Sequence, residues 1–303
     1  MSEPCGILIV NKPVGITSHD VVGRVRRLFG TRRVGHTGTL DPLASGVLVV
    51  LIGRAAKAAE YLVCDEKSYR ATMRLGLTSD TEDVTGTLVP STTPLPSTDR
   101  VIETARDFVG EISQIPPMYS ALKVDGQKLY DLARRGITVE RQARPVTIHA
   151  LTVTPTDIPS DYILDVTCSA GTYIRTLCAD IGTALGCGGV MATLERTAAG
   201  GFPLSDAHTL EEMENMGAEE RLATLLPTEH LFATLPAIRL PAFYERLFRS
   251  GCEIYQKKIG THLALATRVR VCNADGKFFA LGEVREYEDG TAIKSIKMFD
   301  LEI

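Results

Sequence analysis

The order of apolar and polar residues along the chain predicts strands mixed with helices. Short apolar runs, and runs in which every second residue is apolar, are typical of strands. We expect strands at residues 6–10, 47–52, 69–75, 146–154 and 162–168. Apolar residues spaced three or four positions apart are typical of helices. This spacing predicts helices from Thr17 or Ser18 to Phe29, over 55–62, over 101–109, and from a cap at Thr172 to Leu185.

The last part of the chain has a different pattern. From about residue 237, short runs at 268–272, 278–284 and 292–299 alternate with glycine-containing turns, which predicts a small β-rich module. The acidic stretch 205–221, with Pro227 and Pro236 after it, favours a domain boundary before this module. Residues 89–98 are rich in Pro, Ser and Thr, which indicates a surface connection.

Residues 119–145 form a segment with a high density of positive charge. Its basic side chains are Lys123, Lys128, Arg134, Arg135, Arg141 and Arg144. A hairpin turn at Asp125-Gly126 and a short helix over 129–135, stopped by Gly136, are expected within it. We interpret the segment as an excursion from the core that can close over a polyanion. From charge alone, an ordinary solvated helix face is an equally good reading.

Composition and the lack of a targeting segment lead us to expect a soluble globular protein that stays in the cytoplasm. Of the 303 residues 44% are hydrophobic and 23% charged, and the net charge is −4. No apolar run approaches the length of a membrane span, and residues 6–10 lack the shape of a signal peptide. The seven cysteines are scattered, with no C-x-x-C spacing, so we expect buried reduced thiols rather than disulfides or a zinc site.

The most unusual segment is a glycine-rich loop expected over residues 34–46. It contains the run GHTGTLDPLASG, in which His36 and Asp41 are the side chains able to do chemistry. Glycines let a ligand approach the backbone closely, and a carboxylate in such a loop can face a cleft. By turn statistics alone, Asp41-Pro42 is more often simply a turn.

Two further residues, Arg175 and Tyr69, could form a site together with Asp41. Arg175 stands near the start of a predicted helix, where the helix dipole does not favour a cation, so it needs an anionic partner if it faces inward. An Arg175 facing Asp41 would keep that carboxylate ionised, as a nucleophile requires. Tyr69 lies on a predicted strand and could stack on a base, although a strand tyrosine is more often part of a core.

Motifs that would signal a cofactor are missing from the sequence. There is no phosphate-binding G-x-x-x-x-G-K-[ST] loop, no G-x-G-x-x-G after a strand, and no H-x-E with P-C-x-x-C of a zinc deaminase. The six histidines are dispersed. We therefore expect chemistry by side chains alone, with no cofactor and no metal.

Taken together, these segments resemble the bacterial type of the TruB family of tRNA pseudouridine synthases. The resemblance covers residues 5 to 205, through GILIVNKP, GITS, GHTGTLDP, the basic segment and GTYIR. It implies an α+β pseudouridine synthase fold, with a mixed, mostly antiparallel central sheet flanked by helices and loops. It also implies a catalytic domain over 1–234 with a thumb-like insertion at 119–145. Residues 235–303 look like a small β-rich PUA-like domain that binds RNA.

The same resemblance implies an activity and a set of residues. The expected reaction isomerises the T-loop uridine of tRNA, position 55, to pseudouridine by base flipping, without a cofactor. Its catalytic residues would be Asp41, Tyr69 and Arg175. Further substrate contacts are expected from His36, Tyr173, Leu194, Lys12, Lys57, Asp83, Arg134 and Arg135. The expected partner is the T-stem-loop of tRNA, bound by a cytoplasmic monomer that needs no membrane and no obligatory protein partner.

Three alternatives remain open on the sequence. One is an RNA-binding or RNA-folding protein without catalysis, and another is a pseudouridine synthase that acts on a different RNA. A carboxylate glycosidase is the third, although no second acid stands in a persuasive context. The point of attack by Asp41, at the ribose carbon or at the uracil ring, is also open.

Overall fold

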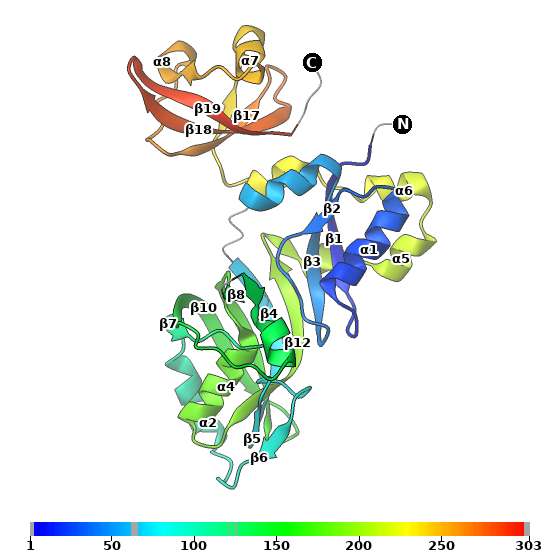
Figure 1. The fold of residues 1–303 in the computed structure, drawn as a ribbon, viewed down its shortest axis with the longest axis vertical. Coiled ribbons are helices and arrows are strands. Elements are labelled where there is room, and N and C mark those ends of the chain that lie inside the picture. Colours follow the sequence, from blue (N-terminus) through cyan, green and yellow to red (C-terminus); the bar gives the residue numbers. More distant parts are fainter. Residues whose placement is uncertain (1–2, 62–65, 121, 125, 300–303) are drawn as a thin grey trace.

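The computed structural model describes residues 3–61, 66–120, 122–124 and 126–299. In the described part, ten strands form one mixed sheet with the main path β14-β1-β3-β12-β4-β11-β10-β7 (Figure 1). The pairing is antiparallel except for β1 with β14 and β3 with β12. These strands are β1 (Gly6–Lys12), β2 (Val34–His36), β3 (Ala44–Ile52), β4 (Glu66–Leu75), β7 (Gly110–Gln114), β10 (Arg144–Pro155), β11 (Asp161–Ser169), β12 (Gly189–Ala199), β13 (Phe202–Pro203) and β14 (His208–Thr209).

Helices pack on both faces of this sheet at β1 and β3, and on one face of it at β4; two short hairpins extend from the sheet. The α-helices are α1 (Ser18–Phe29), α2 (Thr98–Arg106), α3 (Leu129–Arg134), α4 (Ile174–Ala184), α5 (Leu210–Asn215) and α6 (Ala218–Ala223). The 3₁₀ helices are η1 (Gly53–Tyr61), η2 (Leu204–Asp206) and η3 (Thr228–Phe232). The hairpins pair β5 (Leu77–Ser79) with β6 (Leu88–Pro90), and β8 (Lys123–Val124) with β9 (Gln127–Lys128). No helix among the described residues is long and apolar enough to span a bilayer.

Strand β3 is apolar along nearly its whole length because both of its faces are covered. On β3, Val47 and Val49 pack toward η1 and η3, whereas Leu48 and Val50 pack against α1 and α5. Strand β4 instead has one open face. Tyr69 and its alternate neighbours enter the core under α4, while the intervening Arg70 pairs with Asp165 on β11. The alternation on β4 therefore points Tyr69 inward, toward α4.

A second sheet lies at the other end of the molecule, at the top of Figure 1. Its strand order is β15-β17-β18-β19-β16, and the described residues add α7 and α8 to it. The elements are β15 (Ala237–Arg239), α7 (Ala242–Arg249), β16 (Ile254–Tyr255), α8 (Gln256–Ile259), β17 (Arg268–Cys272), β18 (Phe278–Tyr287) and β19 (Gly290–Met298). This sheet has its own core, but Leu281 and Phe299 also join a cluster with Phe232 of η3 and Ala55 of η1.

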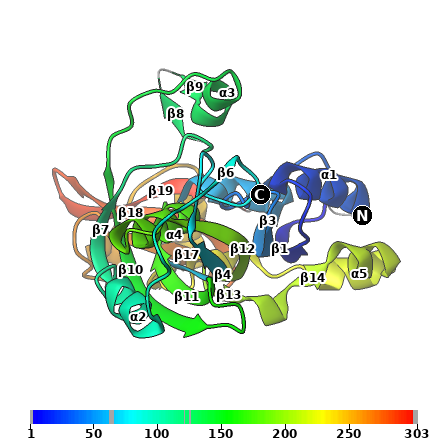
Figure 2. The ribbon, with the colours of Figure 1, turned by 90° about the horizontal axis from the view of Figure 1, so that it is seen from below.

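Several sequence expectations hold, and local chemistry explains them. The strands expected at 6–10, 47–52, 69–75, 146–154 and 162–168 all form, with longer bounds. Helix α1 begins with a capping box in which Thr17 and Asp20 bond each other's backbone amides, and Gly30 ends it in the left-handed conformation. The hairpin and short helix of the basic segment also form, although Asp125 lies outside the described residues. Figure 2 shows β8, β9 and α3 projecting from the body.

Other expectations were wrong in detail. Thr172 does not cap α4, because its hydroxyl donates to the Ser169 carbonyl and the cap residue is Tyr173. The helix expected over 55–62 is the 3₁₀ helix η1, and the helix expected over 101–109 is α2, which starts earlier and ends at Arg106. The ends of the expected 34–46 loop are strands β2 and β3, and the 89–98 connection begins in strand β6.

The acidic stretch and the cysteines also differ from expectation. Residues 205–221 do not lie between domains: they contain β14, which pairs with β1 in the large sheet, and helices that pack against it. The described cysteines are all free, but Cys5 and Cys252 are exposed rather than buried. Cys64 lies outside the described residues.

Candidate active site

The loop between β2 and β3 carries Asp41 and is fixed on both sides of it. The Ser18 hydroxyl donates to the Leu40 carbonyl (3.0 Å) and accepts from the Leu40 amide (2.8 Å). The Gly15 amide donates to the Pro42 carbonyl (2.7 Å). Since Leu40 and Pro42 flank Asp41, both neighbours of the acid are held by one segment. The side chain of Asp41 itself is 43% exposed, so its carboxylate faces open space from a fixed backbone.

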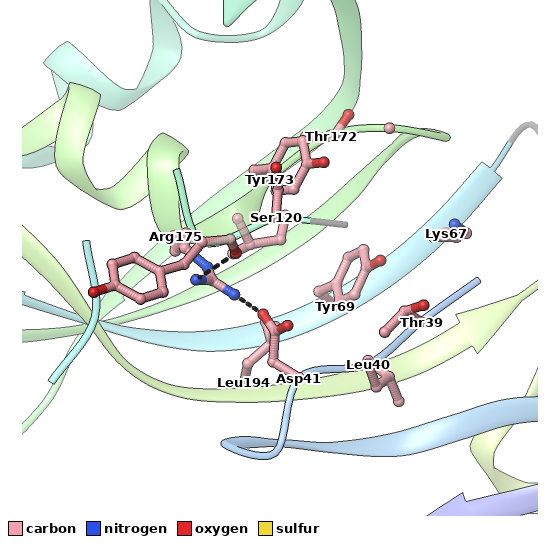
Figure 3. Close-up of a pocket in the computed structure, with 13 residues that line it drawn as sticks. Thr39, Leu40, Asp41, Lys67, Tyr69, Ser120, Thr172, Tyr173, Arg175 and Leu194 are labelled. Carbon is pink, nitrogen blue, oxygen red and sulfur yellow. Dashed lines mark hydrogen bonds and ion pairs between the residues drawn. The ribbon is translucent and has the colours of Figure 1, made fainter. Parts of the chain in front are cut away.

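Arg175 lies in the first turn of α4 and forms an ion pair with Asp41 through Nη2 (Figure 3). Its side chain is only 7% exposed. Its Nη1 donates to the Tyr119 carbonyl (3.4 Å) and lies 3.6 Å from Oδ2 of Asp83. Burial lowers the pKa of the Arg175 guanidinium from its ordinary value. Two carboxylates beside the guanidinium favour its charged form and so oppose this effect.

Asp83 is the buried one of the two carboxylates beside Arg175. Its Oδ1 accepts hydrogen bonds from the hydroxyls of Thr81 and Thr85 and from the Thr85 amide. Asp83 is therefore held in place by its own loop, which leaves it as a fixed counter-ion. Of these two carboxylates Asp41 is the more exposed, at 43% against 6% for Asp83.

The exposed face of Asp41 opens into a pocket of about 210 Å³. Tyr69 from β4, Leu194 from β12 and Tyr173 at the start of α4 contribute apolar walls, so three separate elements meet there. Figure 3 shows the Tyr69 ring beside Asp41 and Arg175. Burial raises the pKa of the Tyr69 phenol, which keeps it neutral at physiological pH. A cavity with flat apolar walls and one carboxylate fits a planar polar ring.

A larger cavity of about 930 Å³ lies next to this pocket and shares Asp41 and Arg175 with it. His36 from β2 and Arg134 from α3 both line it. Burial, and next the charge of Arg196, lower the pKa of the His36 imidazole, so it is neutral at physiological pH. Its Nδ1 is buried and makes no hydrogen bond within the described structure. This cavity extends the pocket toward the basic segment.

The structure thus brings together many of the residues singled out in the sequence. Those that line the pocket or the adjoining cavity are Asp41, Tyr69, Arg175, His36, Tyr173, Leu194, Asp83 and Arg134. Arg135 is exposed on the basic segment, where it donates to Gln127 (2.7 Å). Lys57 is exposed on η1 and lines neither cavity.

Lys12 was expected to contact the substrate, and the structure places its side chain in the interior. It is completely buried, and its Nζ donates to the carbonyls of Pro13 and Ile16, both at 2.9 Å. Burial lowers its pKa to about 8. Lys12 therefore holds the turn that precedes Ser18, and it lines neither of these two cavities.

Sequence reasoning missed Gln114, which is buried on β7. Its side-chain amide accepts from the Tyr173 amide (3.0 Å) and donates to the Tyr173 carbonyl (3.2 Å). These two bonds fix the residue at which α4 begins, and with it the approach of Arg175. Nothing in the local sequence marks Gln114, because its partner is distant in the chain.

Comparisons with known proteins agree with this fold. A crystal structure of a Cbf5-Nop10-Gar1 complex aligns with 97% of this chain and 85% of that chain, at a TM-score of 0.74 and 26% identity. An archaeal Nop10-Cbf5 complex gives a TM-score of 0.73 at 25% identity, over 98% and 87% of the two chains. These neighbours define the class: the chain has the pseudouridine synthase fold.

Sequence comparisons define the family. The model for the TruB family pseudouridylate synthase (N terminal domain) matches residues 26–174, and that for the tRNA pseudouridylate synthase B C-terminal domain matches 175–233. A tRNA pseudouridine synthase B of Clostridium kluyveri is 40% identical over 97% of this chain and 99% of its own length. That of Burkholderia mallei is 42% identical over 93% of both. The chain belongs to the TruB family and is an isomerase that forms pseudouridine in tRNA.

Proposed function

We propose that this enzyme isomerises the uridine at position 55, in the T loop of tRNA, with Asp41 as its nucleophile. The observation that carries the proposal is the Asp41–Arg175 ion pair on the wall of a pocket bounded by Tyr69. The partly exposed acid is paired with a buried guanidinium, and a flat ring lies next to it. A nucleophilic carboxylate and a stacked pyrimidine need that arrangement.

The reaction breaks the bond between ribose C1′ and uracil N1 and forms one between C1′ and C5. One proton leaves C5 and one is gained at N1, so the product is an isomer of the substrate. Asp41 attacks the bound nucleotide at one of two atoms. At ribose C1′ it displaces uracil N1 and is itself displaced when C5 bonds to C1′; on the uracil ring it stays bonded until it is eliminated after the C1′–C5 bond has formed. Tyr69 would hold the base by stacking while it turns.

The base must leave its stack before it can reach Asp41. Flipping a nucleotide out costs roughly a few kcal/mol, which phosphate contacts elsewhere on the RNA can offset. In this proposal the thumb at 119–145 supplies such contacts and excludes water, since water captured by the ribose would give hydrolysis instead. His36, neutral and at the cavity wall, would occupy the space that the flipped base leaves.

We further propose that the catalytic domain spans 1–234, that residues 235–303 form a PUA-like domain, and that a monomer acts in the cytoplasm. The proposed chemistry needs no residue from a second copy, because the pocket already holds Asp41, Tyr69 and Arg175. The free cysteines are compatible with a reducing compartment. Lys57 is proposed as a contact to RNA outside the pocket.

A single assay tests the proposed reaction and its position. Unmodified tRNA transcript is incubated with the purified chain, without metal or nucleotide, and pseudouridine is mapped by chemical labelling. Stoichiometric product at position 55 is expected. A matched transcript in which that uridine is replaced by cytidine should give none. Product at another uridine would overturn the T-loop assignment, and the absence of product with intact binding would favour an RNA-folding role.

The thumb should contribute binding through its arginines. Replacing Arg134 and Arg135 by glutamine should weaken tRNA binding, and the slope of log K against log salt should flatten by about 0.7 to 0.9 for each phosphate that the variant no longer neutralises. Filter binding over a salt series measures both. Arg100 and Arg106 provide the matched control, because both are exposed. They belong to α2, which lies on the side of the body away from α3 (Figure 2). A slope unchanged by the thumb pair, or equally changed by the α2 pair, contradicts a specific role for the thumb.

A further inference from the structure

Arg196 of β12 is a fully buried arginine that no carboxylate pairs with among the described residues. Its Nε donates to the Val47 carbonyl (2.7 Å) and its Nη2 to the Gly38 carbonyl (3.1 Å). A longer bond runs from Nη1 to the Thr39 carbonyl (3.5 Å). Burying a guanidinium is costly unless its donors are satisfied, and here backbone carbonyls do this.

The three carbonyl groups that accept from Arg196 belong to two different parts of the chain. Val47 belongs to β3, whereas Gly38 and Thr39 belong to the loop that presents Asp41. Segment 15–18 fixes the second half of that loop, at Leu40 and Pro42. The first half is held by the Thr37 amide, which donates to the Val49 carbonyl (3.0 Å), and by the Arg196 side chain at Gly38 and Thr39. A planar fork of donors can bond carbonyls from two directions at once, which an ammonium group does less well.

The backbone around Arg196 is built to let its side chain reach the loop. Gly46 has a φ of +100°, and a Cβ there would collide with the Arg196 carbonyl, so β3 and β12 make their close parallel contact at this point. Gly38 has a φ of +84°, and its open side faces Nζ of Lys67 and Nη1 of Arg196. Both glycines are therefore needed where the chain comes nearest to this arginine.

We propose that Arg196 is a positioning residue for the reaction: it holds the Gly38–Thr39 backbone so that the carboxylate of Asp41 meets its target. The inference rests on the proposed role of Asp41 as nucleophile. Arg196 lines neither cavity, so it acts through the groups it contacts: the Gly38–Thr39 backbone, and the Tyr69 hydroxyl, to which the guanidinium also forms a hydrogen bond. A displacement of the nucleophile by about 1 Å can lower a rate by about 100-fold while substrate binding is maintained.

The test is Arg196→Lys, which keeps the positive charge and removes the planar guanidinium with its several donors. Its single-turnover rate of pseudouridine formation should fall by about 100-fold, while the Kd for a T-arm stem-loop stays within about threefold of the wild-type value. Arg221 provides the matched control, because its guanidinium also donates to two backbone carbonyls, those of Leu28 (2.6 Å) and Met216 (2.7 Å), away from both cavities. Arg221→Lys should leave the rate unchanged, and circular dichroism establishes that each variant is folded.

Gly38→Ala serves as a second variant in case Arg196→Lys fails to fold. An alanine disfavours the positive φ at Gly38 and so turns the peptide whose carbonyl Arg196 holds, leaving the arginine in place. The same selective loss of rate is expected. A near-normal rate in the folded variant overturns the inference, as does an equal loss of rate and affinity, or an equal loss of rate in Arg221→Lys. Wild-type activity and an inactive Asp41→Asn, scored in the same assay, show that the proposed function itself stands.

Discussion

Replacing Asp41 by asparagine is expected to abolish pseudouridine formation while tRNA binding is retained. The amide has almost the shape of the carboxylate but is a poor nucleophile, so single-turnover rates should fall by at least about 10⁴-fold. Such a loss corresponds to about 5.5 kcal/mol of transition-state stabilisation. Arg175 keeps Asp83 as a counter-ion at 3.6 Å, so the substitution does not leave a buried charge without a partner.

The control for Asp41→Asn is another aspartate with the same kind of partner. Asp165 pairs with Arg70 on the open face of the sheet and lines neither cavity. Asp165→Asn should bind tRNA and turn it over at nearly the wild-type rate. Binding measured by filter retention, together with mapped product, separates the two variants. Substantial product from homogeneous Asp41→Asn protein would remove Asp41 from the role of nucleophile.

Replacing Arg175 by lysine should produce the second large effect. The guanidinium reaches Asp41 with one nitrogen and the Tyr119 carbonyl and Asp83 with the other, and a single ammonium cannot bridge these groups. The carboxylate of Asp41 would then lose its orientation and part of its electrostatic support. We expect a loss of about 100-fold or more in the single-turnover rate with little change in affinity for tRNA.

Arg70→Lys is the matched control for Arg175→Lys, because it alters an exposed bidentate pair with Asp165 (2.8 and 3.0 Å). Exposed pairs contribute little to stability, so that variant should remain fully active. Chemical denaturation checks that Arg175→Lys is folded under assay conditions. Turnover by Arg175→Lys as fast as that of Arg70→Lys would show that the ion pair is dispensable for the reaction.

The sequence predicted the elements whose signals are local. Helix α1 is an example, because both its cap at Thr17 and its terminator Gly30 stand next to the apolar periodicity in the chain. Thr172 was misread as a cap, since its hydroxyl has a competing acceptor in the Ser169 carbonyl. The same competition between a side chain and the backbone makes caps hard to place from sequence.

The candidate site could be predicted only in part. The family resemblance singled out Asp41, Tyr69 and Arg175, and the fold brings them to one pocket. The supports around them are tertiary: Gln114 bonds to Tyr173 from a strand at the far edge of the sheet. The burial of Lys12 could not be predicted either, because a lysine at the end of a strand is normally solvated.

The cluster that joins the two sheets has a consequence for any shortened form of this enzyme. Phe278, Leu281 and Phe299 of the C-terminal sheet cover Phe232 and part of η1. A truncation after residue 234 would remove these residues and expose Phe232 and its apolar neighbours to water, which favours self-association. Reduced activity of the truncated chain would then reflect the exposed apolar surface as well as any loss of affinity for RNA.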